Sequence, residues 1–284
     1  MSLVRLAIPT SWGELALAGG SRAGEATFVL LPQLRLALDA GRAHRALPPM
    51  STLFLSHGHL DHAGGIPHWA SQRYLNAMGA GTILAPAPVA PLVEELLALC
   101  ARLEGGRPYE VEVRAVAPGE RVPLRSRGVH LEPFPTDHWV PTLGCRLVLT
   151  RTRLRRELRD LPQEEIARRR LRGEPVTESL EIPFLSYCAD TGPGLFEDNP
   201  GVFASEVVLL ECSFYRPQDR ERAREYGHLH LEDLVRAAPG WTCRHLVVLH
   251  PSRRTRIREA VGLLEERLAP VFGGRLHHMM LDWP

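Results

Sequence analysis

The chain has 284 residues, of which 44% are hydrophobic and 24% charged, and its formal net charge is +1. This composition excludes a disordered, fibrous or membrane-embedded protein, and we expect one layered α/β domain over residues 1–284. All 34 basic residues are arginine, which excludes mechanisms that need a catalytic or phosphate-anchoring lysine. Because the net charge is near zero, any site for a polyanion must be a local basic patch.

Short apolar runs bounded by turn residues predict nine strands. They span 26–31, 34–39, 51–56, 81–86, 129–135, 145–150, 182–188, 206–211 and 245–250. Apolar residues recur three and four positions apart in 91–105, 230–238 and 256–268, which predicts helices. Paired strands followed by alternation indicate two packed sheets with helices on the outside.

The sequence also carries expectations about its cellular environment. Its N-terminus lacks a charged start followed by an unbroken apolar run, and no segment reaches about 18 apolar residues. The five cysteines are odd in number, widely spaced and without a CxxC pair, which argues against a disulfide framework. We therefore expect a cytoplasmic protein with no membrane segment, whose cysteines are reduced core residues.

One segment between two predicted strands is too polar to belong to a core. Residues 151–173 hold nine arginines and four acidic residues. Composition leaves two interpretations of residues 150–175 open: a solvated pair of surface helices, or a projecting basic arm that binds a phosphate backbone.

The sequence SHGHLDH at 56–62 follows a predicted strand and places four metal-ligand side chains within six residues. His57 and His59 point the same way in extended backbone, whereas Asp61 and His62 begin the next turn and can face a neighbouring centre. Imidazole and carboxylate suit zinc, with manganese or iron possible, and a dinuclear site needs about seven or eight such ligands. The other ligands must therefore come from elsewhere in the chain.

Four further side chains of ligand type stand where predicted strands end: His138, Asp190, Glu211 and His250. The carboxyl ends of strands gather ligand sites in layered α/β folds, so these segments can converge. A lone histidine is more often a core or cap residue. That interpretation is given to His44, His68, His130, His245, His277 and His278.

The HxHxDH motif, followed by single His, Asp and His residues at strand ends, resembles the metallo-β-lactamase fold signature. Within that superfamily the chain is similar to the short form of ribonuclease Z, the tRNA 3′-processing endonuclease, from about residue 13 to 280. The motifs are LPQLRLALDAGR, FLSHGHLDHAGGIP, DHWVPTLGCRLV, the basic insertion, CADTGP, LLECSF, EYGHLH and VLHPSRR. The resemblance implies a four-layer αββα sandwich with a short basic helical insertion.

The same resemblance implies seven ligands for two zinc ions per chain, in two groups that share a carboxylate. The groups are His57, His59 and His138 for one ion, Asp61, His62 and His250 for the other, and Asp190 as the bridge.

Proton transfer is assigned to three residues. By the resemblance, His228 would protonate the leaving group, and Glu211 would hold its tautomer and favour the imidazolium. Without the resemblance, His228 is equally a histidine at the start of the helix predicted over 230–238. We also expect Asp61 to accept a proton in addition to binding metal.

Substrate phosphate is expected to contact Ser252 and Arg254, because hydroxyl and guanidinium groups suit phosphate oxygens. Ser252 is as well placed to be the N-cap of the following helix. The basic insertion supplies five more candidate substrate-binding residues: Arg153, Arg155, Arg156, Arg168 and Arg169.

The chain departs from the family's usual pattern at two positions. Ala189 precedes the bridging aspartate where glycine is usual, and Leu229 follows the proton donor where threonine or serine is usual. The insertion is also short and arginine-rich rather than long and rich in Gly and Pro. This fits either a short-armed subgroup or a chain that hydrolyses a smaller phosphodiester.

Three functions follow as hypotheses. The first is a zinc-dependent endoribonuclease that removes 3′ trailers from precursor tRNA, as a homodimer in which the arm of one subunit presents substrate to the other. The second keeps the metals but acts on a small substrate such as a cyclic nucleotide. The third is a catalytically inactive RNA-binding module. We favour the first, because it accounts for both the basic insertion and the His228 and Glu211 pair.

Overall fold

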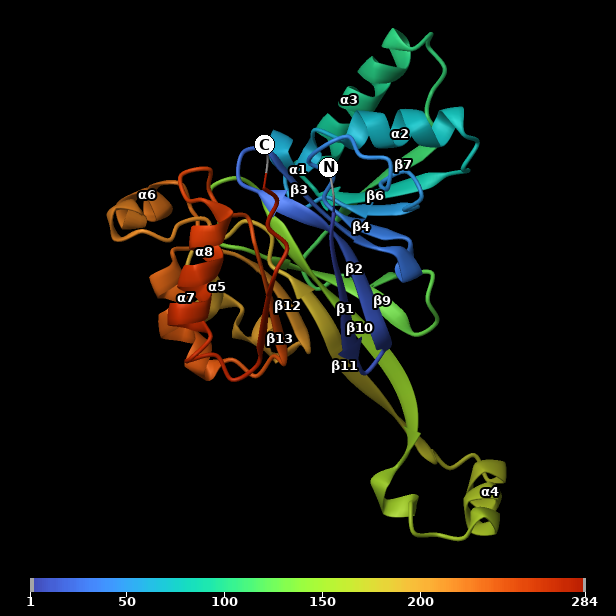
Figure 1. Ribbon diagram of the computed structural model, residues 1–284. Coiled ribbons are helices and arrows are strands. Elements are labelled where there is room, and N and C mark those ends of the chain that lie inside the picture. Colours follow the sequence, from blue (N-terminus) through green and yellow to red (C-terminus); the bar gives the residue numbers. More distant parts are fainter. Residues whose placement is uncertain (1–2, 283–284) are drawn as a thin grey trace.

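The computed structural model describes residues 3–282, which form two seven-stranded sheets packed face to face with helices outside them (Figure 1). The strand order is β1-β2-β3-β4-β5-β6-β7 in the first sheet and β14-β13-β12-β11-β10-β9-β8 in the second. Each sheet is antiparallel at one side and parallel at the other, with the change at β4 in the first sheet and at β11 in the second. The two sheets are therefore similar halves of one architecture.

The strands of both sheets follow in chain order. They are β1 (Val4–Thr10), β2 (Gly13–Arg22), β3 (Ala26–Leu31), β4 (Leu36–Leu38), β5 (Thr52–Phe54), β6 (Gly81–Pro86) and β7 (Val111–Val116) in the first sheet. The second has β8 (Val122–Pro123), β9 (Val129–Pro135), β10 (Leu143–Leu154), β11 (Thr177–Tyr187), β12 (Val207–Glu211), β13 (His245–Leu249) and β14 (Arg275–His278).

The helices divide between the two outer faces and the insertion. Helices α1 (Leu60–Ala63) and α2 (Ile66–Leu75) connect β5 to β6, and α3 (Ala90–Leu103) connects β6 to β7. The insertion holds α4 (Gln163–Leu171). The second sheet carries α5 (Leu195–Asp198), α6 (Arg220–Glu225), α7 (Leu231–Ala237) and α8 (Ile257–Leu263), the last continuing as a π-helical turn over Leu264–Leu268.

Three apolar clusters hold the four layers together. The central cluster lies between the sheets and joins Phe54 of the first sheet to Leu147 and Phe184 of the second. A second cluster packs α2 and α3 on the outer face of the first sheet, and a third packs α7 and α8 on the second. Burial of both faces explains why the parallel strands are continuous apolar runs. The predicted αββα sandwich is confirmed.

All nine predicted strands and all three predicted helices are present, but five strands and one long helix were not predicted. The strands that were not predicted are β1, β2, β7, β8 and β14. Helix α2 buries Ile66, Trp69, Ala70 and Arg73, which have helical spacing. Arg73 is buried because it donates hydrogen bonds to backbone carbonyls, among them those of residues 48 and 79. A search for apolar residues at helical spacing does not detect a buried arginine.

Residues 151–176, which we call the arm, project from the second sheet. Strands β10 and β11 pair antiparallel up to Leu154 and Thr177, and beyond them lie a 3₁₀ turn at Arg156–Leu158 and helix α4 (Figure 1). Leu158 and Val176 are the buried side chains of the arm. The insertion is thus a projecting ribbon with a helical tip, and the interpretation as a pair of surface helices is wrong.

The structure bears on two predictions about the cellular environment, the absence of a membrane segment and the state of the cysteines. No helix within residues 3–282 is long and apolar enough to cross a membrane. The five cysteines are free thiols, and four of them are buried as predicted, whereas Cys100 is half-buried and not a core residue.

The arm should be separable from the stability of the body. Replacing residues 155–176 with an Asn-Gly hairpin turn removes only two buried side chains, so the melting temperature should change by less than about 4 °C. Leu147→Ala, in the central cluster, should instead lower the free energy of unfolding by about 2–5 kcal/mol. Thermal denaturation followed by circular dichroism checks both, and loss of cooperative unfolding in the arm variant would contradict the separation.

Candidate active site

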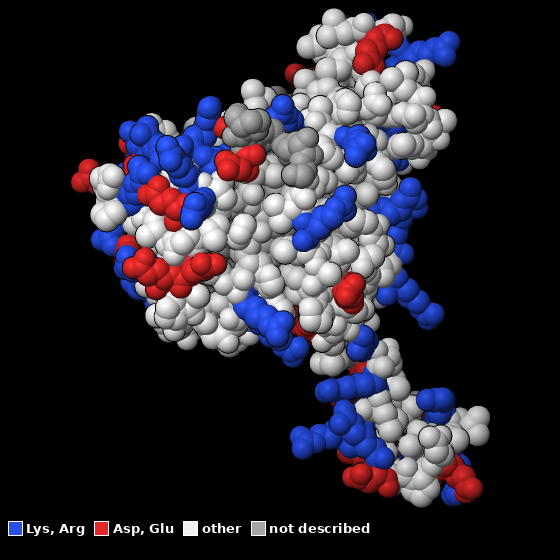
Figure 2. All heavy atoms as spheres, in the orientation of Figure 1, with Lys and Arg blue, Asp and Glu red and all other residues white. Residues whose placement is uncertain are grey.

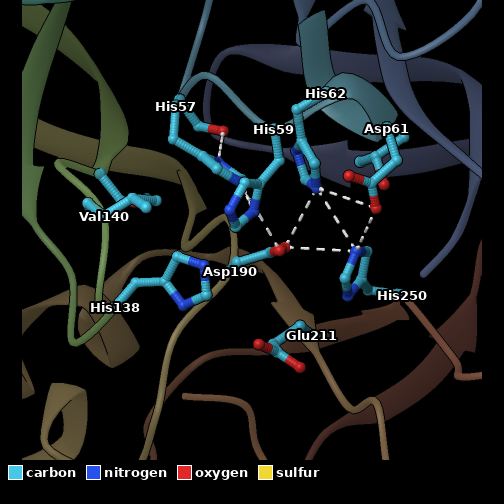
Figure 3. A network of polar contacts seen from close by, with 12 residues as sticks. His57, His59, Asp61, His62, His138, Val140, Asp190, Glu211 and His250 are labelled. Atoms are coloured by element: carbon cyan, nitrogen blue, oxygen red, sulfur yellow. Dashed lines mark hydrogen bonds and ion pairs between the residues drawn. The ribbon is translucent and has the colours of Figure 1, made fainter. Parts of the chain in front are cut away.

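Seven side chains from four separated segments meet beyond the carboxyl ends of the strands, where Figure 3 shows them facing one another. One group unites His57, His59, His138 and Asp190, and another unites Asp61, His62 and His250; within each group the possible ligand atoms lie within 4.8 Å of one another. The structure therefore brings together all seven residues predicted as metal ligands.

Asp190 lies between the two groups. Its Oδ2 is 3.7 Å from His57 Nε2, and its Oδ1 is 3.2 Å from His62 Nε2 and 3.4 Å from His250 Nε2. The side chain is buried. One carboxylate thus faces both groups, as a bridging ligand requires.

The backbone turns sharply at two of these positions. Ala189 (φ 51°) and His250 (φ 61°) lie in the left-handed region, which favours glycine. His250 directly follows β13, and Ala189 lies two residues beyond the end of β11, so each left-handed turn stands where the chain leaves a strand for the site. The usual glycine before the bridging aspartate has a clear physical reason, and in this chain Ala189 adopts the same conformation with a side chain.

Neighbouring groups fix the tautomers of the ligand histidines. The Ser56 hydroxyl donates to Asp39 (2.8 Å), so it accepts from His57 Nδ1 at 2.9 Å. His62 Nδ1 donates to Asp39 at 2.6 Å. The proton on Nδ1 leaves His57 Nε2 unprotonated and directed at the centre. Burial alone would lower the pKa of His62, but Asp190 and Asp39 raise it, so His62 Nε2 must release a proton before it can bind a metal.

The other ligand histidines are held in the same way. His138 Nδ1 donates to the Gly227 carbonyl at 3.0 Å. The Ser213 hydroxyl donates to Glu211 at 2.6 Å and accepts from His250 Nδ1 at 3.0 Å. Sequence reasoning missed Asp39, Ser56 and Ser213, although Asp39 ends a predicted strand as the proposed ligands do.

The donor set fits divalent cations. His57 Nε2 lies 3.0 Å from His59 Nδ1, and His138 Nε2 is buried without a hydrogen-bond partner among the described residues. Burial lowers the pKa of His57 to about 2 and also lowers the pKa values of His59 and His138, so these rings are neutral. Converging neutral nitrogens and ionised carboxylates are the ligands that zinc and similar metals take in proteins.

The second group combines two imidazoles with the carboxylate of Asp61. His62 Nε2 and His250 Nε2 lie 3.4 Å apart, and Asp61 Oδ2 is 3.4 Å from the latter. Burial would raise the pKa of Asp61, but its contact with His250 and the nearby His62 hold it below its usual value. A carboxylate with a low pKa stays ionised and is a weak proton acceptor, which favours ligation as the role of Asp61.

His228 and Glu211 form a pair beside the seven residues. His228 Nδ1 donates to Glu211 Oε1 at 2.7 Å, and its ring centroid lies 5.4 Å from that of His138 and 5.3 Å from that of His250. Burial alone lowers the pKa of His228, but the charge of Glu211 and the hydrogen bond to it raise the pKa to about 9. His228 is therefore an imidazolium at neutral pH, the state of a proton donor.

The chain is similar to a known family of proteins. A beta-lactamase superfamily domain model matches residues 23–250. Nuclear ribonuclease Z of Triticum aestivum is 32% identical over 162 residues, which are 57% of this chain and 91% of that protein. The chain belongs to the ribonuclease Z family of the beta-lactamase superfamily.

A second relative by sequence agrees with this membership, and two solved structures share the fold. tRNase Z TRZ1 of Arabidopsis thaliana is 29% identical over 264 residues, which cover 92% of this chain and 93% of that protein. The short form of human tRNase Z has a TM-score of 0.58 at 14% identity, and the match covers 93% of this chain and 97% of that chain. The metallo-beta-lactamase fold protein YhfI of Bacillus subtilis has a TM-score of 0.60 at 16% identity, with 93% and 96% covered. The resemblance and the fold predicted from the motifs are confirmed.

Two helix starts in this ribonuclease Z family member differ from the alternatives that the sequence left open. His230 is the N-cap of α7: it accepts from Glu232 N at 3.1 Å, so His228 is not the helix-start histidine. Helix α8 starts at Ile257 with Arg256 as its N-cap, so the N-cap interpretation of Ser252 is wrong. Ser252 instead donates its backbone N–H to Ser213 at 2.9 Å, which ties it to the residue that holds His250.

The arginines predicted to bind substrate fall into two classes. Arg254 is exposed four residues after His250. In the arm, ion pairs with glutamates engage four of the five: Arg153, Arg155, Arg168 and Arg169. Arg156 has no ion pair or side-chain hydrogen bond within residues 3–282, and neither do Arg159 and Arg170, which the sequence did not single out.

Asp39 should control metal affinity without touching a metal. It accepts from Ser56, Tyr187 and His62, so Asp39→Asn should release the His62 ring and weaken binding of Zn²⁺ by about 10–100-fold. Competition with a chromogenic chelator measures this, with Asp160→Asn in the arm as control. Equal affinities of the two variants would contradict the role, provided that circular dichroism shows both folded.

Glu211 should control the protonation of His228. The His228 pKa is raised, so the imidazolium is present below about pH 9 and lost above it. In Glu211→Gln, burial is left as the dominant effect and the pKa should fall below its ordinary value near 6.5. NMR titration of the metal-free protein measures the pKa of His228 in wild type and in Glu211→Gln, with Glu206→Gln as control. A His228 titration unchanged by Glu211→Gln would refute the coupling.

Proposed function

We propose that this protein is a metal-dependent endoribonuclease that removes 3′ trailers from precursor tRNA and leaves a 3′-hydroxyl on the tRNA. The observation that carries the proposal is the His228–Glu211 pair, which lies against both groups of ligand residues. A proton donor in that place suits a leaving alkoxide, and relatives named tRNase Z supply the substrate class.

The metal proposal is two zinc ions per chain, with manganese or iron compatible with the same donors. His57, His59 and His138 would hold one ion, Asp61, His62 and His250 the other, and Asp190 both. When bound, such a pair supplies Lewis acidity that lowers the pKa of a water and stabilises charge on phosphoryl oxygens.

The protein's own contribution to proton transfer centres on His228. Because Nδ1 donates to Glu211, the proton on Nε2 is the one left for the leaving 3′-oxygen. Glu211 also accepts from Thr191 N at 2.9 Å and from Ser213, so its position is fixed by the ligand loops. The donor is thereby oriented before substrate binds.

The arm provides the support for an RNA substrate rather than a cyclic nucleotide. Strand β11 runs from the arm toward the site over 11 residues, or about 36 Å, and Asp190 lies three residues beyond its end. We propose a homodimer in which each arm holds the tRNA that the other subunit cleaves. A cytoplasmic location stays a prediction, and one relative is a chloroplastic tRNase Z.

Cleavage of a 3′-extended tRNA tests the function. The protein with Zn²⁺ should produce mature-length tRNA, and EDTA should abolish the reaction. Replacement of residues 155–176 with Asn-Gly should abolish cleavage of the tRNA but preserve hydrolysis of bis(p-nitrophenyl) phosphate. Loss of both activities, or retention of both, would contradict the assignment of the arm.

Within the arm the unpaired arginines should matter most. The variant Arg156→Ala, Arg159→Ala, Arg170→Ala should lower the slope of log Kd against log salt concentration by about one for each arginine removed, because each loses one phosphate contact. The matched variant Arg153→Ala, Arg168→Ala, Arg169→Ala removes arginines already paired with glutamate, so its effect should be smaller. The dependence of log Kd on log salt concentration distinguishes the two, and equal slopes would contradict the ranking.

A further inference from the structure

Trp139 is an exposed aromatic residue at the site. It directly follows His138, yet 68% of its surface is accessible to solvent, more than any other tryptophan within residues 3–282. Tryptophan is highly buried on average, and a large ring left open at a site is available to bind a partner.

Its position is fixed by three neighbours. The indole centroid lies 5.1 Å from that of His59 and 5.8 Å from that of His138, two rings on one side of the site in Figure 3. Its edge also packs on Gly227, where an added Cβ would lie 3.2 Å from Trp139 Cδ1 and meet a backbone φ of +63°. The indole is thus supported on the protein side and open on the other.

Gly227 places the indole beside the proton donor. His228 is the next residue, and its ring centroid is 5.4 Å from that of His138. Trp139 therefore lies at the edge shared by the first ligand group and His228. A nucleotide whose 3′-oxygen is near His228 has its own ribose, and hence its own base, within reach of this edge.

We propose that Trp139 is a stacking subsite for the base of the last nucleotide that remains on the tRNA after cleavage. This inference rests on the proposed function and adds the place of one base. Single-stranded RNA ends are commonly held by stacking on aromatic rings, and stacking tolerates any base because every base has a π-face. The subsite therefore positions the scissile phosphate without selecting a sequence.

The test combines protein variants with substrates that lack one base. Trp139→Leu keeps an apolar cover over the histidines but cannot stack, whereas Trp139→Phe keeps an aromatic ring. Trp139→Leu should raise KM for 3′-extended tRNA about 10–100-fold, and Trp139→Phe much less. Leu103→Ala, 80% exposed at the end of α3, is the control for loss of an exposed apolar side chain and should change nothing.

The substrates locate the stacked base. With an abasic last tRNA nucleotide, wild type and Trp139→Leu should have equal KM, because the contact is already absent. The assignment of the base is wrong if wild type and Trp139→Leu still differ in KM on that substrate but have equal KM on a substrate with an abasic first trailer nucleotide. If Trp139→Leu cleaves the intact substrate like wild type, or if Trp139→Phe is as defective as Trp139→Leu, the subsite is refuted.

A binding measurement separates this proposal from the proposed function. In EDTA-treated protein, a short RNA that ends at the last tRNA nucleotide should quench part of the intrinsic fluorescence, and Trp139→Phe should remove that quenching while still binding the RNA. Absence of cleavage by wild type would refute the function; absence of Trp139-dependent quenching would refute the subsite.

Discussion

The site depends on one buried carboxylate held between two groups of imidazoles. Asp190 is 2% exposed, and burial alone would raise its pKa, but His250 and His62 hold it well below the usual value. A buried anion is tolerated only where cationic groups or metals compensate it. Because its two oxygens face different groups, the loops that carry those groups must come from both sheets, and the packing of the sheets positions the centre.

The loops around this carboxylate are joined by hydrogen bonds into one unit. Asp137 accepts from Gly194 N at 2.8 Å through its side chain and from Gly192 N at 2.6 Å through its carbonyl. A Cβ at either glycine would lie within 2.7 Å of the Asp137 carboxylate, so both positions exclude a side chain. Asp137 precedes His138, and the glycines follow Asp190. The contact thus fixes a ligand of the first group against the bridging residue before any metal is bound.

Patterns local to the sequence predicted most of this fold, and contacts at long range explain what they missed. Buried parallel strands are apolar runs, so they were visible, and their ends pointed to Asp190 and His250. Asp39 ends a predicted strand in the same manner, and the same rule extends to it. Ser56 and Ser213 have no periodic signal, since they matter only because a ring from elsewhere lies against them. Strands β1 and β2 were not predicted, because they pair with each other at one edge of the first sheet and their apolar patterns are interrupted.

The arm shows how charge and geometry act together. A ribbon can leave the body because the antiparallel pairing of β10 and β11 satisfies its backbone groups within the two strands themselves. Its glutamates pair with many of its arginines, so the field at the tip is set by the few that remain unpaired rather than by the count of basic residues. Figure 2 shows basic and acidic side chains near one another on the arm. A tip of few free cations at the far end of β11 can orient a long polyanion, yet it attracts small anions weakly, and this separation favours a substrate that spans the distance.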